Sequence, residues 1–420
     1  MHHSTKRAAL AAAAVVAAAT AVATVSLPTA FAAPAAPRTV GVSVTPGGTA
    51  GNADVGSVVL SRDGKVAAFD SAASDLTAGD TNGKADVFVR TLATGRTERI
   101  ALAGRQLRSP SLSRDGRYVA LVTAPDDNYS ASDVRLYDRR TKKFQRLDVE
   151  LPSGFEGKGA GTVSLTPDAR YAVFDTAQRE GSDGQVVFLR DRRTGTTERV
   201  SHPNPGWEPR SAHSATVSDD GRKVVYAHNY TNGPRGDDWS DVWLRDRRTG
   251  RLTQVDRSHD GSTTEKESLK PSISGDGRKV VFESRDTHLV PNDDDKAWNV
   301  FVHDLASGTN RRVQHARGGP REAYTRAPAI SPDGRRLTYM TEVREPGAQY
   351  GTEWPVYVRD LTTNKSTLVT PDKTGGTASA EVAPGAIAAG GKRIAFRSAD
   401  ASLLPGDTND GYDAFVRHLR

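Results

Sequence analysis

The nine residues SGDGRKVVF, from Ser274 to Phe282, place a tight turn in front of a short apolar segment. The same pattern returns at six other places in the chain. The other copies are SRDGKVAAF at Ser61, SRDGRYVAL at Ser113, TPDARYAVF at Thr166, SDDGRKVVY at Ser218, SPDGRRLTY at Ser331 and AAGGKRIAF at Ala388. Neighbouring copies start 52 to 57 residues apart, so one supersecondary unit repeats through most of the chain.

Each unit predicts four short strands, A to D. In the fifth unit, strand A covers residues 270–274 and strand B residues 279–283, joined by the DG turn. Strand C begins with a pattern such as DVWLR at Asp241, and a TG-type turn leads to a strand D such as TERVS, residues 197–201. Strands B and C are almost continuously apolar, which predicts burial on both faces, whereas strand D alternates with charged residues as a solvated edge does. The pattern therefore predicts an all-β, seven-bladed β-propeller of four-stranded antiparallel blades.

The seventh unit ends soon after its strand C, which is DAFVR from Asp413, and no strand D follows it. Residues 39–44 (TVGVSV) precede the first unit and have the character of the other D strands. We therefore expect this N-terminal strand to complete the last blade and close the ring, because closure pairs an edge that would otherwise be exposed.

The S-x-D-G-[RK] turns followed by apolar strands resemble the WD40-like (PD40-type) repeats of TolB-type β-propellers, and the resemblance covers residues 38–420. It implies a propeller in an exported bacterial protein, with a six-bladed TolB-like ring as the alternative to seven blades. TolB has a separate N-terminal α/β domain that takes part in its envelope contacts, and this chain has no room for one between its N-terminal segment and its first repeat. TolB's partners are therefore not carried over. Some relatives with such repeats are polysaccharide lyases or propeller domains of peptidases.

The first residues have the features of a secretion signal. Lys6 and Arg7 precede an Ala- and Val-rich run, and Ala30-Phe31-Ala32 is a small-residue cleavage pattern. We expect a signal peptide over residues 1–32 cleaved near Ala32, a short linker over residues 33–37 and a propeller over residues 38–420. The protein is then secreted or held in the cell envelope, with no transmembrane segment after cleavage. An uncleaved N-terminal anchor helix is the alternative.

Composition excludes several classes of protein. With 36% hydrophobic residues and one long apolar run, the chain is not a polytopic membrane protein. It has no Cys, which excludes disulfides, thiolate metal sites and Cys nucleophiles. Removing Lys6 and Arg7 with the signal lowers the formal net charge of +6 by two, so the mature protein is mildly basic.

Antiparallel blades place the A–B and C–D turns on one side of the ring, which we call the turn face, and the B–C and D–A loops on the other, the long-loop face. The turns sum to a charge of +18, and the B–C loops contain 22 acidic and 6 basic residues. This polarity suits charged partners. The exposed bases of the turn face either contact anionic polymers or lipid head groups, or simply solvate the turns. Nucleic acid is not expected, because aromatic residues are not interleaved with these bases.

Two loops of the long-loop face resemble the beginning of a calcium site. Oxygen-bearing side chains occupy positions 1, 3 and 7 of each loop: Asp80, Asn82 and Asp86 in one, and Asp407, Asn409 and Asp413 in the other. The sequence thus predicts Ca²⁺ as a cofactor at these two places. Neither loop has a downstream bidentate Glu, and Asx turns that bond loop amides explain the same residues without a metal.

Histidines and tryptophans give weaker hypotheses. His202, His213, His228 and His259 fall near Asp237, Asp238 and Asp241 and could hold a transition metal, but their spacing matches no metal motif. The chain has no GxSxG elbow, P-loop or HExxH. The loop tryptophans Trp207, Trp239, Trp298 and Trp354 could stack on sugars. However, Trp298, Trp354 and Tyr412 each directly precede strand C, and a repeated register favours packing between blades.

From these features we expect a monomeric binding or scaffolding module that uses its long-loop face on a protein or a cell-wall glycan. The alternative is a glycan-active enzyme, similar to a polysaccharide lyase, with its site on the same face. No catalytic residue is predicted.

Overall fold

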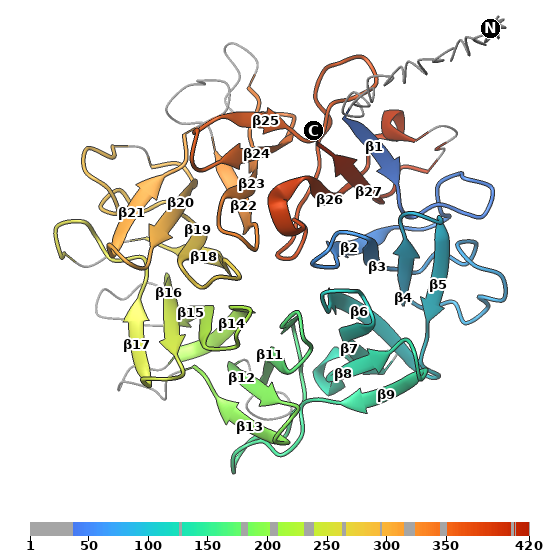
Figure 1. The fold of residues 1–420 in the computed structure, drawn as a ribbon, viewed down its shortest axis with the longest axis horizontal. Coiled ribbons are helices and arrows are strands. Elements are labelled where there is room, and N and C mark those ends of the chain that lie inside the picture. The colour runs from blue at the N-terminus through green and yellow to red at the C-terminus, as the bar shows by residue number, and fades with distance from the viewer. Residues whose placement is uncertain are drawn as a thin grey trace, which may run out of the picture. The chain divides into compact units, whose positions relative to one another are not determined.

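The computed structural model describes residues 37–125, 128–177, 184–201, 209–230, 239–262, 266–294, 296–314, 324–344, 351–404, 407 and 409–419. The expected signal peptide lies outside these residues. The described chain forms a ring of seven antiparallel sheets, as the repeats predict, and the six-bladed alternative is wrong (Figure 1).

The first six sheets have four strands each, in chain order from the centre of the ring to its rim (Figure 1). Blades 1 to 3 are β2 (Val55–Leu60), β3 (Val66–Ser71), β4 (Asp86–Thr91) and β5 (Arg96–Ile100); β6 (Arg105–Leu112), β7 (Tyr118–Pro125), β8 (Asp133–Asp138) and β9 (Lys143–Arg146); β10 (Val163–Leu165), β11 (Tyr171–Ala177), β12 (Gln185–Asp191) and β13 (Thr196–Arg199). Blades 4 to 6 are β14 (Pro209–Val217), β15 (Lys223–Tyr230), β16 (Trp239–Asp246) and β17 (Arg251–Gln254); β18 (Ser268–Ile273), β19 (Lys279–Ser284), β20 (Asn299–Asp304) and β21 (Thr309–Arg312); β22 (Thr325–Ile330), β23 (Arg336–Thr341), β24 (Val356–Asp360) and β25 (Ser366–Leu368).

The seventh blade joins the two ends of the described chain. Its strands β26 (Arg393–Ser398) and β27 (Asp413–His418) are followed at the rim by β1 (Arg38–Gly41), which pairs antiparallel with β27. The innermost position is a short segment in which Ile387 bridges Ile394. The N-terminal closing strand is therefore confirmed, although it is shorter than expected: Val42 adds one backbone bond to Ala414, and Val44 pairs with Ala50 instead.

The core lies between the blades rather than within them. Phe69 and Ala67 of β3 pack toward blade 7, whereas Val66 and Ala68 of the same strand pack toward blade 2. Seven such clusters separate the seven pairs of neighbouring blades. Because alternate side chains of one strand enter different clusters, strands B and C must be apolar on both faces.

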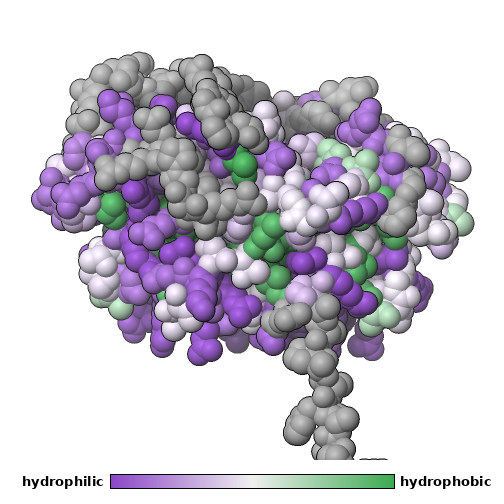
Figure 2. Space-filling view, turned by 90° about the horizontal axis from the view of Figure 1, so that it is seen from above, coloured by the Kyte–Doolittle hydropathy of each residue, from purple (hydrophilic) through white to green (hydrophobic). Residues whose placement is uncertain are grey.

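Polar residues dominate the outside of the ring. In the view of Figure 2, hydrophilic residues cover most of the described surface, and hydrophobic residues gather in small patches. The rim strands are largely exposed or half-buried, as their charged sequences predict. Three one-turn 3₁₀ helices are the helical segments of the described chain: η1 (Tyr129–Ala131), η2 (Ala389–Gly391) and η3 (Ala401–Leu403).

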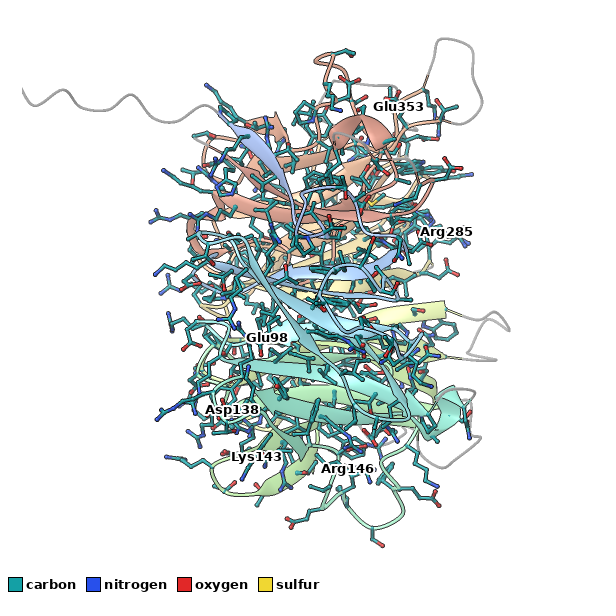
Figure 3. The ribbon with its side chains drawn as sticks, turned by 90° about the vertical axis from the view of Figure 1, so that its right-hand side faces the viewer. Glu98, Asp138, Lys143, Arg146, Arg285 and Glu353 are labelled. Atoms are coloured by element: carbon teal, nitrogen blue, oxygen red, sulfur yellow. The ribbon has the colours of Figure 1, made fainter. Side chains whose placement is uncertain are left out.

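The two faces expected from the topology are present. Asp138 and Lys143 flank a C–D turn and lie on one side of the molecule in Figure 3, where the ring is seen from its side. Arg285 and Glu353 belong to B–C loops and lie on the opposite side. The turn face and the long-loop face can therefore be discussed separately.

Candidate functional site

A cavity of about 330 Å³ lies at the centre of the ring, lined by the innermost segments of all seven blades. One structurally equivalent position from each blade contributes to its wall. These residues, which we call the inner ring, are Ser57, Ser109, Thr162, Ser214, Lys270, Ala327 and Pro384. The inner ring thus contributes four hydroxyls and one ammonium to the cavity wall.

A β-bulge forms the inner ring. The register between strands A and B shifts at this position in blades 1, 2, 4, 5 and 6. In four of these blades the inner-ring residue has a positive φ, between 50° and 55°: Ser109, Ser214, Lys270 and Ala327. Non-glycine residues adopt this conformation only when their surroundings fix it. The bulges therefore need specific partners.

Carboxylates on strand B of blades 1, 3 and 5 each bind one inner-ring residue, and two of these residues, Ser57 and Ala327, lie at bulges. Ser57 Oγ donates to Asp70 Oδ1 at 2.6 Å, and Thr162 N donates to Asp175 Oδ1 at 3.1 Å. Ala327 N of blade 6 donates to Glu283 of blade 5 at 2.6 Å. Each carboxylate thereby holds an inner-ring residue in place.

These carboxylates are strongly desolvated. Asp175 is 1% exposed, and burial raises its pKa to about 6. Burial also raises the pKa of Asp70. Glycine makes this arrangement possible, since a Cβ at Gly161 would lie 2.4 Å from Asp175 Oδ2.

Lys270 is the cationic member of the inner ring. Its Nζ lies 3.3 Å from Glu283 Oε1, and 53% of its side chain is exposed. The ammonium therefore remains in contact with solvent while Glu283 partly neutralises it.

The turn-face end of the cavity is crossed by an ion pair. Arg62, in the A–B turn of blade 1, binds Asp219, in the A–B turn of blade 4, on the other side of the ring, and both side chains line the cavity. Burial lowers the pKa of Arg62 and raises that of Asp219. Successive A–B turns are also joined by backbone bonds, such as Asp63 N to Arg114 O at 3.1 Å and Arg114 N to Pro167 O at 2.8 Å. The pair spans the cavity at its turn-face end, and the inner ring lies toward the long-loop face.

The first predicted calcium loop is organised around an arginine. Arg99 binds Asp80 at 2.8 Å and Asp86 at 2.6 Å, and Asn82 Nδ2 donates to Asp86 at 3.0 Å. The guanidinium of Arg99 occupies the place where a cation would bridge the two carboxylates, so this loop does not fit Ca²⁺.

The second predicted calcium loop lacks such an arginine. Asp413 Oδ1 accepts from Ser43 at 2.6 Å, and Asp413 Oδ2 is buried with no hydrogen-bond partner among the described residues. Burial, together with the charge of Asp407, raises the pKa of Asp413 to about 6. Asn409, however, binds the backbone through both side-chain ends, at Gly51 O and Gly411 N. Calcium binding stays a prediction.

The histidines of the described residues do not form a cluster. His213 binds Ser214 and Asn229, and His259 binds His288 O on the side of blade 5. His228 is 2% exposed and pairs across the strands with Asp241. His202, Asp237 and Asp238 lie outside the described residues, within which no three His, Cys, Asp or Glu side chains converge as metal ligands do.

The register shared by Trp298, Trp354 and Tyr412 has a backbone cause. Their carbonyls accept from the first residue of the next blade, at 2.8 Å for Trp298 with Thr325 and at 2.8 Å for Tyr412 with Val55. At these positions main-chain hydrogen bonds join neighbouring blades, and all three side chains stay half-exposed. Trp207 lies outside the described residues, and Trp239 stacks on Tyr230.

Part of the basic turn face serves the fold. Arg139 donates to Gly116 O of its own blade and binds Glu98 of the preceding blade. Arg247 repeats this arrangement with Gly221 O and Glu198. These arginines join neighbouring blades, whereas Arg140 and Arg193 are exposed.

Sequence reasoning missed the inner ring. A signal was present, because each member lies three residues before the last residue of its strand A, and five of the seven are Ser, Thr or Lys. Reading strand A for repeated polar positions, rather than for its apolar ones, would have found it.

Comparison with known proteins gives fold-level likenesses. No protein-family model matches the chain, and no curated protein matches it. Among the helices of the described residues, none has the length and hydrophobicity needed to cross a membrane. An oligogalacturonate lyase from Vibrio parahaemolyticus superposes with a TM-score of 0.57 at 13% identity, covering 92% of this chain and 98% of the lyase. The β-propeller domain of the Trilobed protease from Pyrococcus furiosus gives 0.55 at 12% identity, covering 88% and 94%.

TolB from Acinetobacter baumannii is also similar, with a TM-score of 0.42 at 14% identity; the match covers 77% of this chain and spans only 64% of the TolB chain. At these identities the likenesses show the fold alone. The resemblance to TolB-type and other PD40-type β-propellers therefore holds at the level of the fold.

Proposed function

We propose that the protein is an exported binding or scaffolding module, monomeric and released from a signal peptide near Ala32, that engages a protein partner with its long-loop face. The central cavity carries this proposal. Arg62 and Asp219 span it at the turn face, and its inner ring offers hydroxyls and the Lys270 ammonium toward the long-loop face. A cavity with a few placed polar groups in an apolar wall is the usual form of a ligand site.

The hydrogen bonds of the carboxylates at the cavity favour a binding function over glycan cleavage. Asp70, Asp175 and Glu283 are buried, and each accepts a hydrogen bond from an inner-ring residue. A catalytic base needs to reach its substrate, and these groups are committed to the chain itself.

Capture from the organism's own envelope extract tests the proposal, with a glycan array run in parallel. Three proteins are compared: the wild type, Ala383→Trp, which adds bulk to the cavity wall, and Lys143→Trp, which adds the same bulk on the turn face. We expect the wild type and Lys143→Trp to retain the same protein and Ala383→Trp to lose it. Loss with Lys143→Trp alone, or strong binding to the glycan array only, contradicts the proposal.

We also propose calcium at the second loop, Asp407 to Asp413, because Asp413 Oδ2 is buried without a partner among the described residues. A calorimetric titration with CaCl₂ should give heat and a higher unfolding temperature, and Asp413→Asn should abolish both. No heat in the wild type removes the idea.

A further inference from the structure

An arginine stacked on an aromatic ring and paired with a carboxylate recurs on the long-loop face of blades 5 to 7. Arg285 lies 5.8 Å from the ring centre of Trp298, and its guanidinium is 3.0 Å from Glu267. A cation over an aromatic face is attracted by the ring's quadrupole, and the carboxylate adds an ion pair. This combination binds a guanidinium on two sides.

Two more examples follow in the next blades. Arg344 lies 5.4 Å from the ring of Tyr324 and 2.7 Å from Glu342. Arg397 lies 4.5 Å from the ring of Tyr412 and 2.5 Å from Glu381. The same arrangement of arginine, aromatic ring and carboxylate therefore occurs three times on neighbouring parts of the long-loop face.

Trp354 also has a carboxylate beside it, but no arginine stacks on its ring among the described residues. It follows Glu353 in the B–C loop of blade 6, and its ring stacks on Tyr324 with centres 6.3 Å apart and planes 6° apart. Among the described residues, no arginine lies over Trp354, and Glu353 accepts from the Thr377 hydroxyl but pairs with no cation. The ring and the carboxylate are both present without the third member of the set.

The two residues line a cavity of about 320 Å³ between blades 6 and 7, which we call the rim cavity. Glu381, Asp400 and Tyr412 complete its polar and aromatic lining. Glu381 is neutralised by Arg397, whereas the Asp400 carboxylate accepts from the backbone N–H of Ser402 and pairs with no cation among the described residues. The cavity thus retains negative charge beside two aromatic rings.

We propose that the rim cavity binds an arginine side chain of the partner protein, with the guanidinium on Trp354 and paired with Glu353. A neutral sugar would use the rings but would leave the carboxylate charges unbalanced. A lysine would satisfy the charge, but its compact ammonium lacks the planar face and the fork of donors. This inference deepens the proposed function, since it names the chemistry by which the long-loop face recognises a protein.

The test is a calorimetric titration of the folded protein with a capped Gly-Arg-Gly-Arg-Gly peptide, its citrulline counterpart and its lysine counterpart. Citrulline keeps the shape of arginine and removes its charge. We expect the arginine peptide to bind at least about tenfold more tightly than either counterpart, and its affinity to fall as NaCl is raised.

Four variants make the result specific. Trp354→Leu and Glu353→Gln should each weaken the arginine peptide about tenfold, and Trp354→Phe should retain most of the affinity. Glu267→Gln is the matched control, because that carboxylate is already paired with Arg285, and it should leave the affinity unchanged.

Equal affinity for the citrulline peptide, no binding of the arginine peptide, or no effect of Trp354→Leu overturns the inference. If Ala383→Trp still blocks capture of the envelope partner in that case, the proposed function stands and only the arginine site falls. If both fail, the long-loop face is not the binding face.

Discussion

The hydrogen bonds at the inner ring make the geometry of the central cavity depend on single carboxylates. Asp175 accepts from both the backbone N–H and the hydroxyl of Thr162, and Asp70 accepts from Ser57. These inner-ring residues are therefore positioned by carboxylates on the next strand, 13 residues further along the chain. This explains why the apolar pattern of strand A alone could not predict the bulges or the residues that they present.

Asp175 makes a pH dependence measurable. Its pKa in the folded protein is about 6, above its ordinary value of 3.8, because burial disfavours the charged form. The folded state then binds more protons than the unfolded state between these values, so the carboxylate's contribution to stability is full below about pH 4 and is lost as pH rises through 6. The free energy of unfolding of the wild type, relative to that of Asp175→Asn, should fall by about 2 kcal/mol between pH 4 and pH 7. Urea unfolding at several pH values measures it, and parallel curves for the two proteins would contradict it.

Arg62 and Asp219 contact each other only because the ring closes, so their pairing could not be predicted from two positions more than 150 residues apart. Their side chains are 19% and 34% exposed, which limits the strength of the interaction. In a double-mutant cycle with Arg62→Met and Asp219→Asn, we expect a coupling energy of about 1 kcal/mol, lower in high salt. Urea unfolding of the four proteins gives this energy, and strictly additive effects would show that the pair does not hold the turn-face end of the cavity.

At the scale of the strand, β1 decides whether the ring is closed. Its four residues pair with β27, and the following Ser43 both donates to Asp413 at 2.6 Å and accepts from Ala414 N at 2.8 Å. The sequence predicted this strand because residues 39–44 were left over from the repeats. It did not predict where the strand ends, since that depends on the turn that brings Val44 to Ala50.

Truncation tests the closing strand. A protein that begins at Thr45 should unfold at a much lower temperature than one that begins at Pro37, because β27 then presents an unpaired edge and Asp413 loses its partner. Circular dichroism during heating gives both midpoints. The Pro37 protein is the matched control, and equal midpoints would mean that β1 does not close the ring.

For the whole molecule, the repeat spacing was sufficient to predict seven blades and two faces, because each blade has the same strand order. The clusters between blades confirm why strands B and C are apolar throughout. The candidate site was less predictable. The inner ring and the rim cavity arise where several repeats meet, whereas the first of the two loops that resemble calcium sites is organised by Arg99.

Site-specific photo-crosslinking shows which face of the ring contacts the partner, and so tests whether the partner binds the long-loop face. A photoreactive aromatic residue replaces Arg285 on the long-loop face or Lys143 on the turn face, which lie toward opposite edges of the ring in Figure 3. Each protein is irradiated in envelope extract, and the crosslinked partner is identified by mass spectrometry. If the partner binds the long-loop face, one protein is crosslinked at position 285 and none at position 143. The reverse result would contradict binding at this face.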